Sequence, residues 1–216
     1  LADTERTKFE YAGASGGFID YLGYPFCRGR ILSCVEEDKG QYDDRRDIFW
    51  ASGAALCCRR AVFEQLGGFD EDFFAHMEEI DLQWRMQLAG WRIVVEPKSV
   101  VYHLGGGTLP ASSHKIFLNH RNNLAMLFKC ASPLQRAVVA VVRPATDMLE
   151  VVVNLVMLHP HRAWAIVRAW REFIVWHGAL SRKRKAVQRK VAPKGIYRNS
   201  IVVRYILGRR TFNNMM

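Results

Sequence analysis

The order of apolar and polar residues predicts short helices and strands in the first part of the chain. Residues 48–58 form an apolar run of strand length that starts with β-favouring side chains, which predicts a buried strand. Residues 61–66 follow as a short helix, and Gly67 and Gly68 supply the backbone freedom that ends a helix. Cys57 and Cys58 close the apolar run, so we expect both side chains to be packed.

A second helix is predicted over residues 77–88, where apolar residues recur at helical spacing and Gly90 follows as a C-terminal cap. Two short strands are expected next, in residues 92–97 and 99–104. Residues 114–130 then have the pattern of a helix whose polar residues lie on polar faces. These polar residues are Asn119, Arg121, Asn122 and Asn123.

The last part of the chain has a different pattern. Residues 134–158 are apolar, but the charged residues among them keep each uninterrupted run too short to span a bilayer. Residues 161–180 predict an amphipathic helix with three tryptophans, and the basic run 182–185 follows directly. Such a helix is typical of a membrane-surface element, so residues 161–190 are expected to contact an anionic membrane. A core helix with a solvated basic tail is the alternative.

Charge divides the chain in the same way. Of the 216 residues, 50% are apolar and 24% are charged, as in a globular protein. Residues 1–130 have a net charge of −3 and residues 131–216 a net charge of +13, which suggests two domains with these bounds. The basic part lacks a zinc-finger, RNA-recognition or helix-turn-helix pattern, so nucleic acid is not an expected partner. Five cysteines without CxxC spacing favour a reduced, cytoplasmic setting.

Four motifs occur in order within residues 50–108: WASGAAL, RRAVFEQLGGFDEDFFAHMEEIDLQWR, LAGWRIVVEP and VVYHLGGGT. Together they resemble the second half of family 2 (GT-A) glycosyltransferases, in the rhamnosyltransferase-like branch. The resemblance implies an α/β fold: the C-terminal portion of a GT-A, or nucleotide-diphospho-sugar transferase, fold, followed by a helical, basic, membrane-associating tail. It also implies that residues 1–130 are the acceptor and catalytic-base half, and that a nucleotide-binding half preceded them.

The acidic pair Glu78 and Glu79 is the expected catalytic centre. An inverting transferase needs a carboxylate that removes a proton from the acceptor hydroxyl. The resemblance places this base at Glu79 with Glu78 as its neighbour, although the family usually has Glu-Asp here. Alternatively, both acids only favour a helix N-terminus. Asp81 matches the second acid of the motif, and we expect it to have a positional role by pairing with Arg85 or with the loop before the helix, with a direct acceptor contact as the alternative.

Further site residues follow from the same resemblance. Trp50, Ser52 and Gly53 match a segment that lines the sugar cleft, although core packing is an equally good explanation for Trp50. His103 matches a histidine that reaches a divalent metal, Mg²⁺ or Mn²⁺, on the donor diphosphate. This metal would be held mainly by the half that is missing, because no Asp-x-Asp motif follows a nucleotide-binding strand here.

The function expected from these features is hexosyl or rhamnosyl transfer from a nucleotide-sugar donor to a lipid-linked or polysaccharide acceptor in cell-envelope synthesis. The protein is expected to be cytoplasmic and peripheral at the inner face of the membrane, and the isolated chain to be inactive. The alternative is a non-catalytic membrane-surface or scaffold module with a degenerate transferase fold.

Overall fold

The computed structural model describes residues 7–9, 15–101 and 112–215. They form two compact units. The first takes its residues from Leu1–Phe69, Leu82–Gly105 and Gln188–Met216, and the second from Asp70–Asp81 and Gly106–Val187. This grouping differs from the predicted division at residue 130, because the chain enters each unit more than once.

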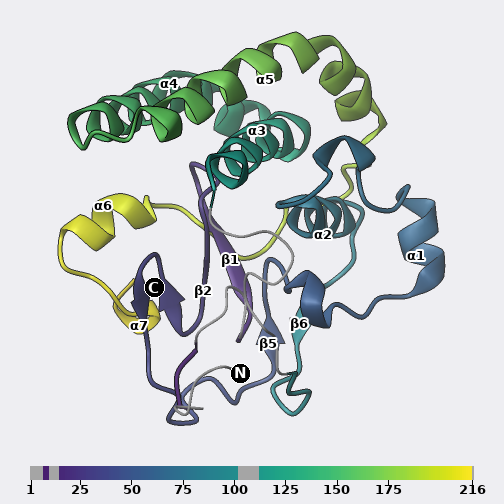
Figure 1. Ribbon diagram of the computed structural model, residues 1–216. Helices are drawn as coiled ribbons and strands as arrows, with labels where there is room; N and C mark the ends of the chain where they lie inside the picture. Colours follow the sequence, from purple (N-terminus) through teal and green to yellow (C-terminus); the bar gives the residue numbers. More distant parts are fainter. Residues whose placement is uncertain (1–6, 10–14, 102–111, 216) are drawn as a thin grey trace. The chain divides into compact units, whose positions relative to one another are not determined.

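The first unit is built on a five-stranded sheet with the order β4-β3-β2-β1-β7, of which Figure 1 labels β1 and β2. The first four strands pair antiparallel in chain order, whereas β7 lies parallel to β1 with Ile19 opposite Ile196. The strands are β1 (Gly17–Asp20), β2 (Pro25–Cys27), β3 (Arg30–Ile31), β4 (Cys34–Val35) and β7 (Ile196–Tyr197).

The last segment of the chain is part of this unit. The carboxylate of Asp20 is fully buried, and it accepts hydrogen bonds from Leu22 N and Tyr24 N in the turn after β1. Its other oxygen accepts from Ile201 N at 3.0 Å, at the start of α6 (Ile201–Ile206). Phe212 of α7 (Phe212–Met215) packs among the aromatic side chains of β1 and β2.

The predicted strand over residues 48–58 is wrong. Only the preceding residues form a strand, β5 (Arg46–Asp47), which pairs with β6 (Val94–Val95). Trp50 forms an isolated bridge to Gly17, and a 3₁₀ turn, η1 (Gly53–Ala55), begins immediately afterwards. A Cβ on Gly17 would lie 2.2 Å from Trp50 Cε2, so the indole ring fills the space above that glycine. The run ends in a capped turn, which leaves Cys57 and Cys58 exposed rather than packed.

The helices of this region largely confirm the prediction. Helix α1 (Arg60–Gln65) ends in a Gly-Gly cap, where Gly68 N donates to Phe63 O at 2.9 Å and both glycines have positive φ. Helix α2 (Glu78–Leu88) begins in the second unit and continues into the first. Gly90, with φ of 102°, follows it as predicted. The first expected strand is confirmed by β6, but Ser99–Val101 has no strand structure, and the rest of that segment lies outside the described residues.

Three long helices form most of the second unit: α3 (Ser113–Cys130), α4 (Pro133–Val156) and α5 (Pro160–Ala186) (Figure 1). The predicted helix over residues 114–130 is thus confirmed. Serine hydroxyls cap α3 and α4 by accepting hydrogen bonds from backbone N–H groups. Small alanines let α5 approach the other two helices closely: Ala165 and Ala169 pack on α3, and Ala163 packs on Val151 of α4.

Several polar residues of these helices are buried. The expectation that Arg121, Asn122 and Asn123 lie on polar faces is wrong, since all three have less than a tenth of their surface exposed. On α4, Arg143 and Asp147 are each 1% exposed and bond to one another at 3.2 Å. Two of the charges that interrupt the apolar run 134–158, Arg143 and Asp147, therefore face the interior of the unit. Among the described residues, the structure contains no helix with enough length and apolar character to cross a membrane.

Candidate active site

The acidic pair lies in the first turn of α2. Burial, and after it the charge of Glu78, raise the pKa of Glu79 to about 7, although two backbone N–H groups act in the opposite direction. Burial also raises the pKa of Glu78, whose Oε2 has no hydrogen-bond partner among the described residues. A carboxylate that is poised near neutral pH in a partly dry environment has the properties of a general base.

The backbone that leads into the pair adopts an unusual conformation. Phe74, His76 and Met77 all have φ between 61° and 70°, in the left-handed region that side chains other than glycine rarely adopt. Each such residue costs about 1–3 kcal/mol, so the surrounding contacts must hold the loop in place. Met77 O then accepts a hydrogen bond from Asp81 N at 2.8 Å, which starts the helical ladder.

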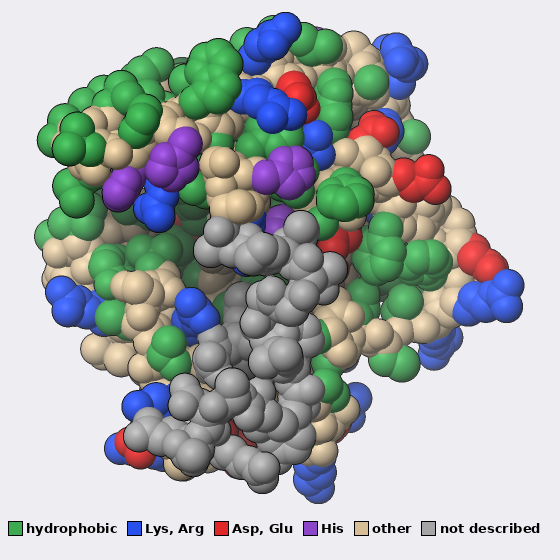
Figure 2. Space-filling view, in the orientation of Figure 1, with side chains coloured by type: hydrophobic (Ala, Val, Ile, Leu, Met, Phe, Trp, Pro, Cys, Tyr) green, Lys and Arg blue, Asp and Glu red, His purple; other side chains and the backbone are tan. Residues whose placement is uncertain are grey.

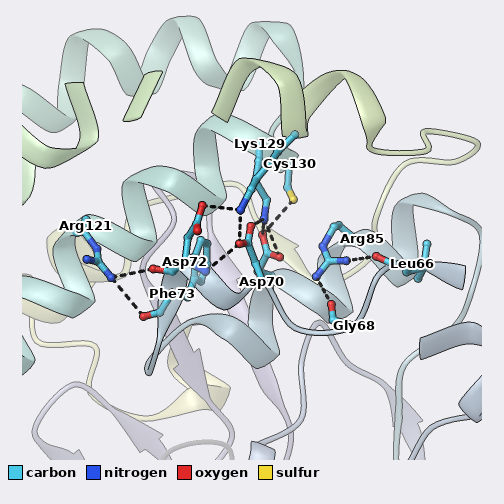
Figure 3. Close-up of polar contacts among 11 residues, drawn as sticks. Leu66, Gly68, Asp70, Asp72, Phe73, Arg85, Arg121, Lys129 and Cys130 are labelled. Atoms are coloured by element: carbon cyan, nitrogen blue, oxygen red, sulfur yellow. Dashed lines mark hydrogen bonds and ion pairs between the residues drawn. The ribbon is translucent and has the colours of Figure 1, made fainter. Parts of the chain in front are cut away.

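Two buried side chains of α3 hold this loop. Asn122 Nδ2 lies 2.8–2.9 Å from three carbonyl oxygens, those of Phe73, Ala75 and His76. Its neighbour Arg121 donates to the carbonyls of Asp72 and Phe73 at 3.1 and 3.3 Å (Figure 3). The backbone carbonyls of the strained segment before the acidic pair are therefore hydrogen-bonded to side chains of the long, regular helix α3.

A buried lysine joins the loop to α2. The ammonium group of Lys129 lies 2.9 Å from Asp81 Oδ1 and also contacts Asp70, above the ring of Phe73 (Figure 3). Lys183 of α5 reaches Asp70 as well, and Asp72 at 2.6 Å. Burial acts to raise the pKa of Asp70, but the two lysines outweigh it and lower that pKa. Asp81 and Asp70 thus share the ammonium group of Lys129, which anchors the loop beside the start of α2.

The other predicted site residues lie in the first unit. The Trp50 ring is 3% exposed and its Nε1 donates to Phe18 O at 2.9 Å, which fits the core-packing alternative. Ser52 Oγ caps η1 by accepting from Ala54 N, and Gly53 is exposed. Arg85 donates to Leu66 O at 2.5 Å and Gly68 O at 2.7 Å, so it fastens the C-terminal end of α1 (Figure 3).

One further cluster has the composition of a metal site. His120 of α3 lies 3.9 Å from Asp147 and 3.5 Å from Glu150 on α4. Burial would lower the pKa of His120, but the two carboxylates outweigh it and raise the pKa to about 9. Asp147 is also bonded to Arg143 and to Trp170 Nε1, so its oxygens already have partners within the unit. The cluster is therefore an ion pair. His103, the predicted metal ligand, lies outside the described residues.

Comparison with known proteins shows that this chain resembles glycosyltransferases. The similar proteins include a rhamnosyltransferase, which confirms the resemblance to rhamnosyltransferase-like enzymes. The N-acetylglucosaminyl-diphospho-decaprenol L-rhamnosyltransferase of Mycobacterium tuberculosis is 47% identical over 88 residues, which is 41% of this chain and 28% of that protein. The chain thus spans less than a third of this relative's length.

Two other matches are weaker. The O-antigen biosynthesis protein RfbC of Myxococcus xanthus is 30% identical over 94 residues, covering 44% of this chain and 7% of RfbC. The pre-mycofactocin glycosyltransferase of M. tuberculosis is 38% identical over 56 residues, covering 26% of this chain and 12% of that protein. No family model and no solved structure matches the chain.

The sequence pattern did not reveal the residues that hold the loop. Asn122 and Lys129 are seven positions apart and so share one helix face with Leu118 and Ala125, which are both buried. Polar residues at these positions of an apolar face are a signal for buried partners. Lys183 lies within a basic run, where its pairing with Asp70 has no local signature.

Proposed function

We propose that this chain is the catalytic-base part of an inverting glycosyltransferase, which transfers a hexosyl or rhamnosyl group from a nucleotide-diphosphate donor to an acceptor hydroxyl in cell-envelope polysaccharide synthesis. The observation that carries the proposal is Glu79, whose pKa is raised to about 7 within the segment whose motifs resemble glycosyltransferases. The curated relatives support the class, and one of them is named for a lipid-diphosphate-linked acceptor.

The proposed reaction uses the Glu79 carboxylate as the base. Its oxygen takes the proton of the acceptor hydroxyl while the hydroxyl oxygen forms a bond to the anomeric carbon. The bond between that carbon and the donor diphosphate breaks, and the leaving diphosphate keeps the electron pair. Because attack and departure occur on opposite faces, the configuration inverts. Asp70, Asp81, Lys129 and Asn122 act as positioning residues for the first turn of α2.

A divalent metal, Mg²⁺ or Mn²⁺, would stabilise the leaving diphosphate when bound. In the described cluster with metal-binding composition, Asp147 is already bonded to Arg143 and Trp170, so we do not assign the diphosphate metal to it. His103 and the preceding half of the enzyme remain the proposed ligands. We further propose a peripheral position at the inner face of the membrane, where a lipid-linked acceptor would be accessible.

The experiment compares Glu79→Gln with the wild type in the full-length protein. We expect sugar transfer to fall by about 10²–10⁴-fold while donor binding is unchanged, because a neutral amide cannot accept the proton. Glu79→Asp should restore part of the activity and shift the rising limb of the pH–rate profile, and runs with and without Mn²⁺ test the metal.

Glu71→Gln, an exposed acid of the same loop, is the matched control. Unchanged turnover in Glu79→Gln would remove the assigned base. If the wild-type full-length protein turns over no nucleotide sugar, the scaffold alternative is favoured.

A further inference from the structure

Helix α4 has the reverse of the usual amphipathic arrangement. Its polar residues Gln135, Arg143 and Asp147 are at most 3% exposed. The residues of Leu134–Leu158 that are exposed as a whole are all apolar, and they recur at helical spacing as one stripe along the helix and around the turn that follows it. The larger members of this stripe, which we call the α4 face, are Leu134, Val141, Met148, Leu149, Val152, Val153, Leu155, Val156, Met157 and Leu158.

The charges that accompany the α4 face are mostly basic, with Glu150, whose side chain is 44% exposed beside His120, as an acidic exception. Residues 133–187 are all described, and among them each charged residue that is exposed as a whole is basic. Figure 2 shows hydrophobic side chains gathered over α4 and α5, with Lys and Arg side chains and a few acidic ones nearby. The exposed basic residues are Arg162, Arg168, Arg171, Arg182 and Lys185.

Part of the basic run that the sequence assigned to membrane contact has an internal role. Lys183 binds Asp70 and Asp72. Arg184 Nη1 lies 2.9–3.1 Å from the carbonyl oxygens of Phe128, Lys129 and Ala131, at the C-terminal end of α3. These two cations stabilise the unit itself, so a contact surface within residues 161–190 cannot be built from the whole run.

We propose that the α4 face lies on an anionic lipid surface, with the exposed arginines of α5 contacting lipid headgroups. This inference deepens the proposed function and rests on it for the expectation that the acceptor is lipid-linked. An apolar stripe bordered mainly by cations matches the surface of an anionic bilayer. A protein interface usually carries about one hydrogen bond per 100–200 Å², whereas every residue of 133–158 that is exposed as a whole is apolar, and the partly exposed Glu150 already faces His120. A symmetric dimer would bring like charges together.

The test is flotation of the chain with vesicles of phosphatidylcholine, with and without phosphatidylglycerol, in the absence of donor and acceptor. The wild type should float with the anionic vesicles. The double variant Val141→Glu/Val152→Glu should reduce partitioning by more than about 10-fold, because charged side chains replace apolar ones. Leu158→Glu, in the turn after the helix, is a second variant that leaves α4 intact. Arg162→Gln/Arg171→Gln should weaken binding about 5-fold per charge, and only on anionic vesicles.

Ile206→Glu is the matched control, because Ile206 is 77% exposed on α6 in the other unit, comparable to Val141 at 75%. It should float like the wild type, and circular dichroism should show that every variant is folded. Wild-type protein that stays at the bottom of the gradient overturns the proposal, as does undiminished flotation of the Val141→Glu/Val152→Glu variant. If light scattering shows a dimer that this variant converts to a monomer, with flotation unaffected, the face is an interface between copies. Binding is measured without turnover, so a failure of Glu79 as the base leaves this result unchanged.

Discussion

Replacing Glu79 by Gln should make the folded chain more stable at about pH 8 and leave its stability nearly unchanged at about pH 4. The pKa of Glu79 is about 7 in the folded protein against 4.5 as its ordinary value. Between these two values the native state holds a proton that the unfolded state releases, so the free energy of unfolding falls as the pH rises. Glutamine keeps the shape of the protonated acid and removes this dependence.

The magnitude follows from the size of the shift. A difference of about 2.5 pKa units at about 1.36 kcal/mol per unit gives about 3 kcal/mol at about pH 8, where the wild type must ionise a buried carboxyl group. Near pH 4 both states are protonated and the gain is close to zero. Urea unfolding of the two proteins at both pH values, followed by circular dichroism, measures the difference directly.

Glu71→Gln is the control for this comparison, because it removes the same charge from an exposed position in the preceding turn. It should change the stability by less than about 0.5 kcal/mol at either pH. An equal effect of Glu79→Gln at both pH values would show that the carboxyl group is well solvated. The basis for a base poised near neutral pH would then be lost, whatever the activity of the complete enzyme.

Two further predictions concern the second unit. Lys129→Met should lower the free energy of unfolding by about 3–5 kcal/mol, because it leaves Asp81 buried without its cation. Adding Asp81→Asn should recover part of the loss. A mild effect of Lys129→Met in urea unfolding would contradict the anchoring role. The ion pairs of His120, with a folded pKa of about 9 against 6.5, contribute stability that is complete below about pH 6.5 and is lost as the pH rises through about 9. His120→Gln should therefore cost about 3 kcal/mol near pH 6 and little above pH 9, and a cost independent of pH would refute the ion pair.

Local patterns were sufficient for some elements and insufficient for others. Helices α1 and α2 follow from apolar spacing and glycine caps, and α3 follows from apolar spacing. These signals act within a few residues. The failure at residues 48–58 has a tertiary cause: Trp50 covers Gly17, and the chain turns at Ser52 instead of continuing as a strand. Residues 48–50 are buried, as the apolar pattern predicts. Their pairing partner, Gly17, lies in a distant part of the chain.

The candidate site shows the same limit. The acidic pair could be found from its motif, and its position in the first turn of α2 agrees with the sequence. The left-handed residues of the preceding loop could not be predicted, since Phe, His and Met have no local preference for that conformation. They are held by Asn122 and Arg121, more than forty positions away in the sequence. Helix periodicity alone treated these two residues as surface side chains.

The parallel pairing of β1 with β7 has a consequence for biosynthesis. Ile19 pairs with Ile196, so the sheet cannot be completed until residues 196 and 197 have emerged from the ribosome. By then the helices between residues 113 and 186 have already emerged. Contacts so distant in sequence form slowly, and one edge of β1 stays unpaired during translation. A shortened chain that stops after α5 would keep that edge open, and we expect it to be recovered mainly as aggregate.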